Sequence, residues 1–298
     1  MDLGSNTVRL LVARVGRDAI EQVLGRELAA PRLGRGLMPG QRLLPAARAE
    51  ALAVLAKFTR RARDLGAQRV ALGATQACRA ASDGAEFVAS LGRELGLERA
   101  QVLSGEEEAR LSRLGVLSRL SGPAKGALLA DVGGGSSELV ELGRADAPAI
   151  SLPLGAVSLT EAHLKGDPPR LAELKALDQA VDQGLAPVRG RRAERLVVCA
   201  GTASTLASLL LGLEVYQPER IDNLLVPLTR LEEEAARLAT LPLAERRRAL
   251  KLDPARADII IAGLAIVRGL LRLLSLREIT AMDSGLLEGI LLDDLARA

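Results

Sequence analysis

Aromatic residues are nearly absent from this chain of 298 residues. It has two phenylalanines, one tyrosine and no tryptophan, although 48% of its residues are hydrophobic. The core must therefore be aliphatic. Proteins that bind single strands by stacking bases on aromatic rings are disfavoured, because the rings are missing. We expect no nucleic-acid partner.

Residues that commonly carry nucleophilic or zinc chemistry are also scarce. The chain has one histidine, His163, and two cysteines, Cys78 and Cys199. A Ser-His-Asp triad would have to use His163, and no G-x-S-x-G segment lies near it. A Cys/His zinc site needs more ligands than the chain offers. Two isolated cysteines suit a reducing cytosol, and we expect both to be buried.

Long hydrophobic runs are missing as well. The most apolar segment, residues 259–274, is interrupted by Arg268 and Arg272, and a membrane span needs about 20 apolar residues. The start of the chain has no basic stretch followed by an apolar one, so no signal peptide is expected. We expect a cytoplasmic protein without a membrane partner, and we expect 259–274 to form a buried helix.

The pattern of apolar residues predicts one order of elements twice: strand-strand-strand-helix-strand-helix-strand-helix. Ser121-Gly122-Pro123 interrupts the pattern between the two sets. Such alternation is typical of the α/β class. We therefore expect an N-terminal lobe over residues 1–117 and a C-terminal lobe over 118–283. The last helix, 284–298, is expected to pack back on the first lobe.

A short motif occurs once in each half. Asp2-Leu3-Gly4-Ser5-Asn6-Thr7 opens the chain, and Asp131-Val132-Gly133-Gly134-Gly135-Ser136-Ser137-Glu138 begins 129 residues later. A turn of glycine and hydroxyl residues at a strand end exposes backbone N–H groups to an anion. The neighbouring aspartate can hold a hard cation such as Mg²⁺. The repeat predicts two related halves facing one phosphate-bearing ligand. The alternative for each motif is a plain glycine-rich hairpin turn.

Three consecutive glutamates begin a predicted helix after Ser104. Ser104 and Glu107 have the spacing of a capping box, and acidic residues suit a helix N-terminus. Three glutamates are more than capping needs. Glu108 shares a helical face with Leu111, so we expect it to face inward as a general base for water. A solvated face is the alternative.

Three other segments have weaker anion-binding signals. Arg79 is expected in a loop after a strand, where an arginine beside a phosphate site would act as a bidentate clamp. Gly201-Thr202 begins a predicted helix whose N-terminus suits a phosphate, and a plain turn capped by Thr202 is the alternative. The basic clusters 189–192 and 246–248 are expected to be solvated surface, or else to guide a polyanion.

Together and in this order, these motifs resemble the exopolyphosphatase and guanosine pentaphosphate phosphatase (Ppx/GppA) family of the actin, sugar-kinase and Hsp70 superfamily. The resemblance implies two ribonuclease-H-like (actin-like) lobes with a cleft between them. It implies release of terminal phosphate, with Mg²⁺ or another divalent cation as cofactor. The segments that carry it are residues 2–10, 75–79, 103–110, 131–138, 151–157, 201–206 and 282–289.

The resemblance also implies roles for individual residues. Glu108 matches the catalytic glutamate of the family. Asp131 and Glu138 match the acidic residues that hold the metal, and Asp2 is a further candidate ligand. The implied phosphate-binding residues are Gly4, Ser5, Asn6, Thr7, Arg79, Gly133, Gly134, Gly135, Ser136 and Ser137.

The predicted reaction is release of terminal orthophosphate from inorganic polyphosphate. Hydrolysis of guanosine pentaphosphate (pppGpp), a non-catalytic nucleotide or alarmone sensor, and a sugar kinase are the alternatives. The Glu108 segment favours hydrolysis because it supplies a base for water. A homodimer is compatible with the aliphatic-rich composition.

The sequence departs from the family pattern in two places. Longer family members carry a C-terminal helical domain similar to the HD phosphohydrolases, and this sequence stops before it, which leaves processivity on long chains open. Family members usually have several residues of strand before the first aspartate, whereas Met1 directly precedes Asp2 here.

Overall fold

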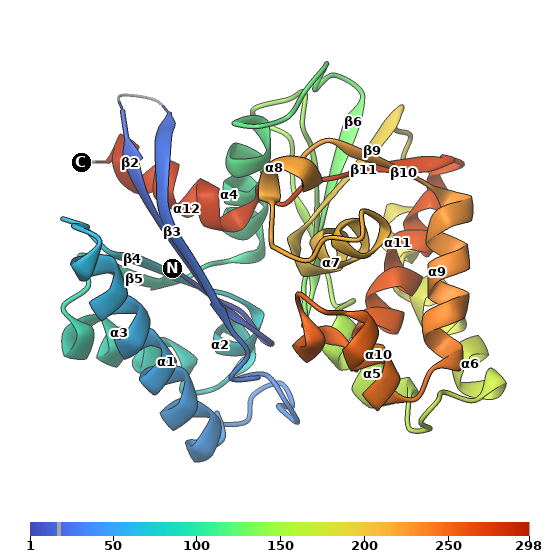
Figure 1. Cartoon of the computed structure of the whole chain (residues 1–298), viewed down its shortest axis with the longest axis horizontal. Helices are drawn as coiled ribbons and strands as arrows, with labels where there is room; N and C mark the ends of the chain where they lie inside the picture. The colour runs from blue at the N-terminus through green and yellow to red at the C-terminus, as the bar shows by residue number, and fades with distance from the viewer. Residues whose placement is uncertain (17–18, 298) are drawn as a thin grey trace. The chain divides into compact units, whose positions relative to one another are not determined.

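The computed structural model describes residues 1–16 and 19–297. The chain divides into two compact units, drawn in Figure 1: unit 1 comprises Met1–Ser118 with Gly285–Ala298, and unit 2 comprises Arg119–Ser284. Residue 298, the end of the predicted last helix, lies outside the described residues. Every helix in the described part of the chain is too short or too polar to cross a bilayer.

Unit 1 is built on a five-stranded sheet in the order β3-β2-β1-β4-β5. The short central strand β1 runs antiparallel to β2 and parallel to β4. Strands β2 and β3 pair antiparallel, and β4 and β5 pair parallel. The strands are β1 (Asp2–Leu3), β2 (Val8–Val15), β3 (Ile20–Ala29), β4 (Ala71–Ala74) and β5 (Arg99–Val102).

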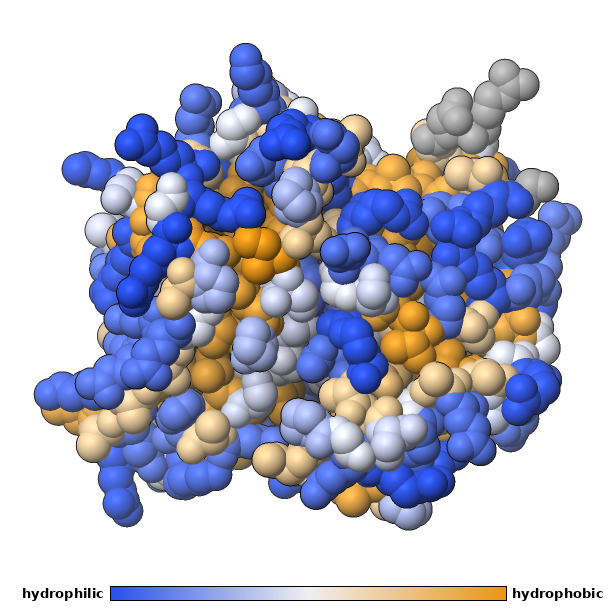
Figure 2. All heavy atoms as spheres, turned by 180° about the vertical axis from the view of Figure 1, so that it is seen from behind, coloured by the Kyte–Doolittle hydropathy of each residue, from blue (hydrophilic) through white to orange (hydrophobic). Residues whose placement is uncertain are grey.

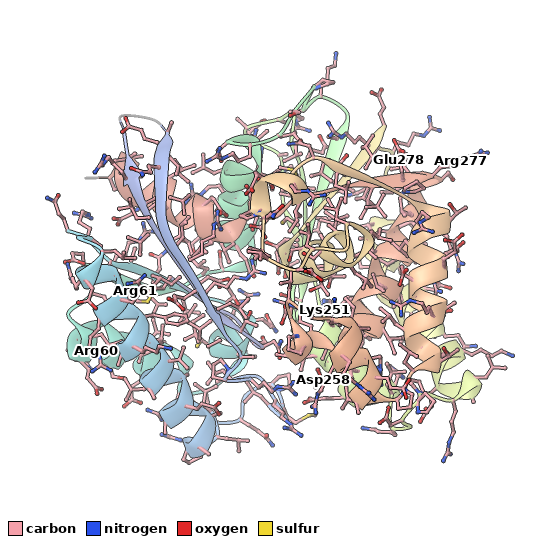
Figure 3. All side chains as sticks on the ribbon, viewed as in Figure 1. Arg60, Arg61, Lys251, Asp258, Arg277 and Glu278 are labelled. Carbon is pink, nitrogen blue, oxygen red and sulfur yellow. The ribbon has the colours of Figure 1, made fainter. Side chains whose placement is uncertain are left out.

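Helices cover both faces of this sheet (Figure 1). On one face, α1 and α3 pack Phe58 and Phe87 into an aliphatic core, while Arg60 and Arg61 of α1 are exposed to solvent (Figure 3). On the other face, α4 and α12 pack around Leu111 and Ile290. The helices of unit 1 are α1 (Pro45–Asp64), α2 (Gln76–Ala80), α3 (Gly84–Leu95), α4 (Gly105–Leu117) and α12 (Leu286–Ala296).

Helices α4 and α12 are in backbone contact. A Cβ atom on Gly115 would lie 1.8 Å from the carbonyl oxygen of Gly285, and one on Gly289 would lie 1.9 Å from that of Leu111. Any larger residue at either glycine would force the two helices apart. The last helix therefore belongs to the packing of unit 1, although the whole of unit 2 precedes it in sequence.

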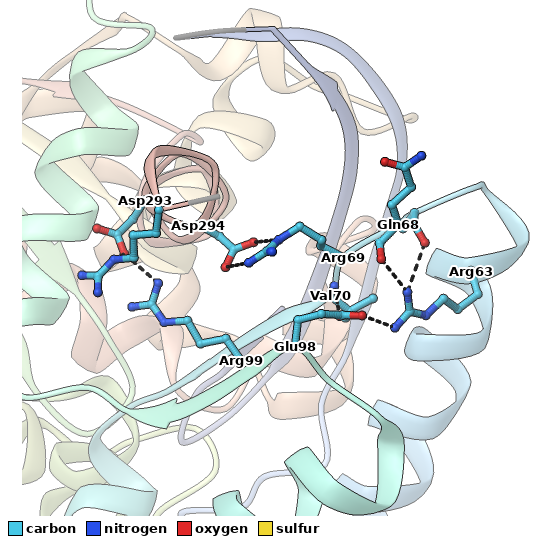
Figure 4. Close-up of polar contacts among 10 residues, drawn as sticks. Arg63, Gln68, Arg69, Val70, Glu98, Arg99, Asp293 and Asp294 are labelled. Atoms are coloured by element: carbon cyan, nitrogen blue, oxygen red, sulfur yellow. Dashed lines mark hydrogen bonds and ion pairs between the residues drawn. The ribbon is translucent and has the colours of Figure 1, made fainter.

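Ion pairs tie the end of α12 to strand β5, to helix α4 and to the segment before β4 (Figure 4). Arg69 donates to Asp294 at 3.0 and 3.3 Å, and Arg99 and Arg110 both donate to Asp293 at 2.8 Å. Burial raises the pKa of Asp293, but the hydrogen bonds from the two arginines outweigh burial and lower this pKa to about 2. The carboxylate therefore stays charged and paired at neutral pH.

Unit 2 repeats the sheet of unit 1 and adds one strand. Its order is β10-β11-β9-β6-β7-β8. Read from the other end, β8-β7-β6-β9-β11 matches β3-β2-β1-β4-β5 in order and in direction. The predicted duplication in an α/β fold is confirmed. The strands are β6 (Ala127–Val132), β7 (Ser137–Glu141), β8 (Ile150–Leu152), β9 (Arg195–Cys199), β10 (Leu224–Pro227) and β11 (Glu278–Ala281).

The core of unit 2 is aliphatic, as its composition requires. Helix α11 is buried along nearly its whole length, which confirms the buried helix predicted over 259–274. Figure 2 shows hydrophilic side chains over much of the face opposite to that in Figure 1, with apolar residues between them. The helices are α5 (Ala156–His163), α6 (Leu171–Gly184), α7 (Ala200–Leu210), α8 (Pro218–Ile221), α9 (Leu228–Thr240), α10 (Leu243–Ala249) and α11 (Ile260–Leu274), with single 3₁₀ turns at Ala186–Val188 and Pro254–Arg256.

Candidate functional site

The two repeated motifs form the same hairpin at the same place in their sheets. In unit 1, the amide of Gly4 donates to the carbonyl of Thr7 at 2.9 Å, between strands β1 and β2. In unit 2, the amide of Gly133 donates to the carbonyl of Ser136 at 3.0 Å, between β6 and β7. The repeat seen in sequence is therefore a repeat in backbone geometry.

A second segment braces the hairpin turn of unit 1. The amides of Arg32 and Gly34 donate to the carbonyls of Asn6 and Ser5 at 3.0 and 2.8 Å. These bonds fix the turn from its carbonyl side. The side-chain Nδ2 of Asn6 is buried and has no hydrogen-bond partner among the described residues. Because a buried amide donor needs an acceptor, this group suits an anion bound at the turn.

The hairpin turn of unit 2 differs, because its serine hydroxyls are already engaged. Ser136 Oγ donates to Glu138 Oε1 at 2.8 Å, and Ser137 Oγ donates to the carbonyl of Leu154 at 2.6 Å. A hydroxyl has one hydrogen to donate. The Ser137 hydroxyl hydrogen is used in the contact with Leu154, and the predicted phosphate contact of Ser137 stays a prediction. Because the Gly133 amide is bonded to Ser136, the backbone N–H groups of Gly134 and Gly135 are the candidate phosphate donors of this turn.

Arg79 and Glu108 meet in unit 1. Arg79 Nη1 donates to Glu108 Oε2 at 2.9 Å and to the carbonyl of Leu103 at 2.7 Å, and Nη2 donates to Gln76 Oε1 at 2.8 Å. Arg79 lies in helix α2, so the loop predicted for it is wrong. These contacts hold the guanidinium in one orientation, with one edge against the Glu108 carboxylate.

The predicted capping box explains why Glu108 differs from its neighbours. The side chain of Glu107 accepts from the amide of Ser104 at 2.9 Å, and the amide of Glu107 donates to Ser104 Oγ at 3.1 Å. Glu107 is exposed at the helix end, whereas Glu108 is only 6% exposed. The inward orientation of Glu108 is confirmed. Glu107 makes the capping contacts, whereas the carboxylate of Glu108 is paired with Arg79.

Asp131 and Glu138 lie side by side in unit 2. They are paired residues of the antiparallel strands β6 and β7, so their Cβ atoms are about 4.5–5.5 Å apart on one face of the sheet. They are 5% and 1% exposed. Asp2 occupies the equivalent position of unit 1, but there the paired residue is Arg9. Only the second hairpin therefore presents two adjacent carboxylates.

This pair fits a magnesium ion. The described residues contain no group of three or more His, Cys, Asp or Glu side chains arranged to hold a metal. Mg²⁺ typically binds one or two carboxylates and completes its shell with water and substrate phosphate oxygens. Asp131 and Glu138 supply hard oxygen donors in that number.

Sequence reasoning missed one arginine next to the start of α7. A Cβ on Gly201 would lie 1.8 Å from Arg256 Cζ, so the buried guanidinium lies directly against the backbone of Gly201. Arg256 is also paired with Asp253. Helix α7 begins at Ala200, so Thr202 lies in its first turn and does not cap it. The sequence signal that could have revealed this residue was the position of Arg256 shortly before α11, the most apolar helix.

Three other predictions concern buried side chains. Cys78 and Cys199 are free and buried, as expected, and burial, together with the charge of Asp83, raises the pKa of Cys78 to about 12. Arg246 belongs to a cluster predicted to be solvated, but it is buried and donates to Asp167 at 3.1 Å. That prediction is wrong for Arg246, although its two neighbours in the cluster are exposed.

Comparison with known proteins agrees with this geometry. The model of the Ppx/GppA phosphatase family matches residues 11–298. Exopolyphosphatase 2 of Mycobacterium tuberculosis is 33% identical, over 98% of this chain and 96% of that protein. The crystal structure of the Aquifex aeolicus family member superposes with a TM-score of 0.82 at 28% identity, covering 99% of this chain and 96% of that one. An exopolyphosphatase from Cytophaga hutchinsonii gives 0.87 at 25% identity, covering 100% and 97%. The chain has the actin-like α/β fold predicted for it and belongs to the Ppx/GppA phosphatase family.

Proposed function

We propose that this protein is an exopolyphosphatase, a phosphoanhydride hydrolase that releases terminal orthophosphate from inorganic polyphosphate by attack of water. The observation that carries the proposal is the buried carboxylate of Glu108, held by Arg79 at the start of α4. The similarity to exopolyphosphatase 2 of M. tuberculosis supports it.

Each proposed role follows from the geometry within one unit. Glu108 accepts a proton from the attacking water, which general-base catalysis requires. Arg79 contributes a guanidinium for the phosphate oxygens while orienting Glu108. The turns at residues 4–7 and 133–136 bind phosphate oxygens through backbone N–H groups. In a loose transition state for phosphoryl transfer, such positioning and charge neutralisation supply most of the catalysis.

Asp131 and Glu138 are the proposed ligands of Mg²⁺ or another divalent cation, with Asp2 as a further candidate. When bound, such an ion neutralises charge on the phosphate oxygens. The protein's own contribution is to hold two carboxylates in adjacent register positions of β6 and β7, nearly out of contact with bulk water.

The two lobes proposed from sequence, residues 1–117 and 118–283, are supported by the division into compact units and by the repeated sheet order. We also propose a cytoplasmic location, which suits a chain whose two cysteines are free. The polyphosphate substrate is favoured over pppGpp because guanine would need a stacking platform. Phe58 and Phe87 are buried in the core of unit 1, which leaves Tyr216 as the one exposed aromatic ring among the described residues.

The test is phosphate release from long-chain polyphosphate, pppGpp and ATP, measured side by side with Mg²⁺ and again with EDTA. We expect the highest kcat/KM on polyphosphate, and loss of activity with EDTA. Faster turnover of pppGpp would overturn the proposed substrate. Tight binding without turnover of any of the three would point to a sensor.

A further inference from the structure

Two serine hydroxyls converge on one oxygen of Glu138. Ser151 Oγ donates to Glu138 Oε1 at 2.7 Å, and Ser136 Oγ donates to the same atom at 2.8 Å. Ser136 comes from the hairpin turn. Ser151 comes from the neighbouring strand β8, where it is the register partner of Glu138. The carboxylate is thus held from two directions.

We propose that Ser151 is a positioning residue for the divalent cation. Its hydroxyl fixes the Glu138 carboxylate in the orientation in which Glu138 and Asp131 bind the ion together. A glutamate side chain has several freely rotating bonds, and ordering it costs conformational entropy. Because two donors already hold one carboxylate oxygen, this entropy is lost when the protein folds and not when the ion binds. This inference rests on the metal role proposed above for the same pair.

The position of Ser151 shows that its side chain contributes little to the packing of unit 2, so a positioning role can be tested apart from folding. Strand β8 is the last strand of its sheet in the described structure, and Ser151 is exposed while its neighbour Leu152 is buried in the core. Replacing an exposed serine by alanine removes little packing. What Ser151 supplies to the interior is one hydrogen bond to a carboxylate that is 1% exposed.

The test is Mn²⁺ binding to the substrate-free protein, followed by the EPR signal of the unbound ion. Removing a hydrogen bond to a metal ligand typically lowers metal affinity about 10–100-fold. We expect Ser151→Ala to weaken Mn²⁺ binding by at least about tenfold within that range. Ser151→Thr keeps the hydroxyl and should bind Mn²⁺ nearly as the wild type does.

Ser90→Ala is the matched control, since Ser90 Oγ donates to the carbonyl of Phe87 within α3 of unit 1. It should leave Mn²⁺ affinity unchanged. In phosphate-release assays, the defect of Ser151→Ala should shrink when Mg²⁺ is raised to saturation, because the variant has lost affinity for the ion and keeps the chemistry. A defect that persists at saturating Mg²⁺ would contradict that expectation.

Ser151→Ala with wild-type Mn²⁺ affinity overturns the inference. So does an equal loss in Ser151→Thr, because the hydroxyl would then not be the cause. The inference and the proposed function fail separately. A wild-type protein that binds Mn²⁺ but releases no phosphate from polyphosphate refutes only the substrate. A wild-type protein that binds no Mn²⁺ refutes the inference.

Discussion

Replacing Glu108 by glutamine removes a proton acceptor and the negative charge beside Arg79, and it keeps the shape of the side chain. Glutamine has the same shape, so the buried site keeps its packing. Its side-chain oxygen still accepts from Arg79, and Arg79 keeps its bonds to Leu103 and Gln76. Substrate binding should therefore survive. Proton transfer from water to the side chain should be lost, because an amide is a very weak base.

The expected loss follows from the usual contribution of a general base. That contribution is about 10²–10⁴-fold, which corresponds to about 3–5 kcal/mol of barrier at 1.36 kcal/mol per factor of ten. Steady-state phosphate release from polyphosphate should show kcat lowered by at least about two orders of magnitude. KM should change by much less.

Glu107→Gln is the internal control, one residue away on the same helix. Glu107 accepts from the amide of Ser104 but is exposed, so this variant should keep its turnover and lose only a little helix stability. If Glu108→Gln turns over within about tenfold of the wild type, well short of a general-base effect, Glu108 is not the base. A variant that melts earlier but turns over normally would mean that the pair with Arg79 is structural.

Three further predictions rest on separate contacts. Arg79→Ala should raise KM for polyphosphate and also lower kcat, because Glu108 loses its orienting partner; unchanged kinetics would show that the guanidinium serves neither. Gly34→Ala places a Cβ 2.8 Å from that of Ser5. Overpacking of this kind costs about 1–3 kcal/mol of unfolding free energy, which urea unfolding would measure. An unchanged midpoint would mean that the segment around Gly34 moves without cost. The lowered pKa of Asp293, about 2 against 3.8, stabilises the fold above pH 4, and this stability is lost as pH falls from about 4 to about 2. A shift of that size is worth about 2.5 kcal/mol at most, reduced to about 1–2 kcal/mol because its arginine partners are partly solvated. Asp293→Asn should flatten the pH dependence of unfolding over that window, and an unchanged slope would contradict the assignment.

Local patterns in the sequence were enough to predict most elements. The apolar segment over 259–274 predicted the buried helix α11, and Ser104 with Glu107 marked the start of α4. The same helical spacing predicted the burial of Glu108. These signals work because each depends on residues within a few positions of one another.

Two kinds of feature were not predictable from sequence: very short helices, and contacts between residues far apart in the chain. Helix α2 has five residues, too few to show a helical period, so Arg79 was expected in a loop. Arg246 is buried because Asp167, 79 residues away in sequence, reaches it. The bond from Ser151 to Glu138 depends on the register of β7 with β8, and no residue pattern reveals that register.

The repeated hairpin is one backbone arrangement with different charged neighbours in the two units. Both copies close with the same glycine hydrogen bond next to an aspartate on the central strand of a sheet. What differs is the register partner of that aspartate: Arg9 in unit 1, and Glu138 in unit 2. Asp2 has a basic register partner, whereas two adjacent carboxylates repel each other and favour a cation between them. This difference favours Asp131 and Glu138 over Asp2 as the main ligands of the metal ion proposed above, and it leaves the turn and the Asn6 amide of the first hairpin as proposed phosphate contacts.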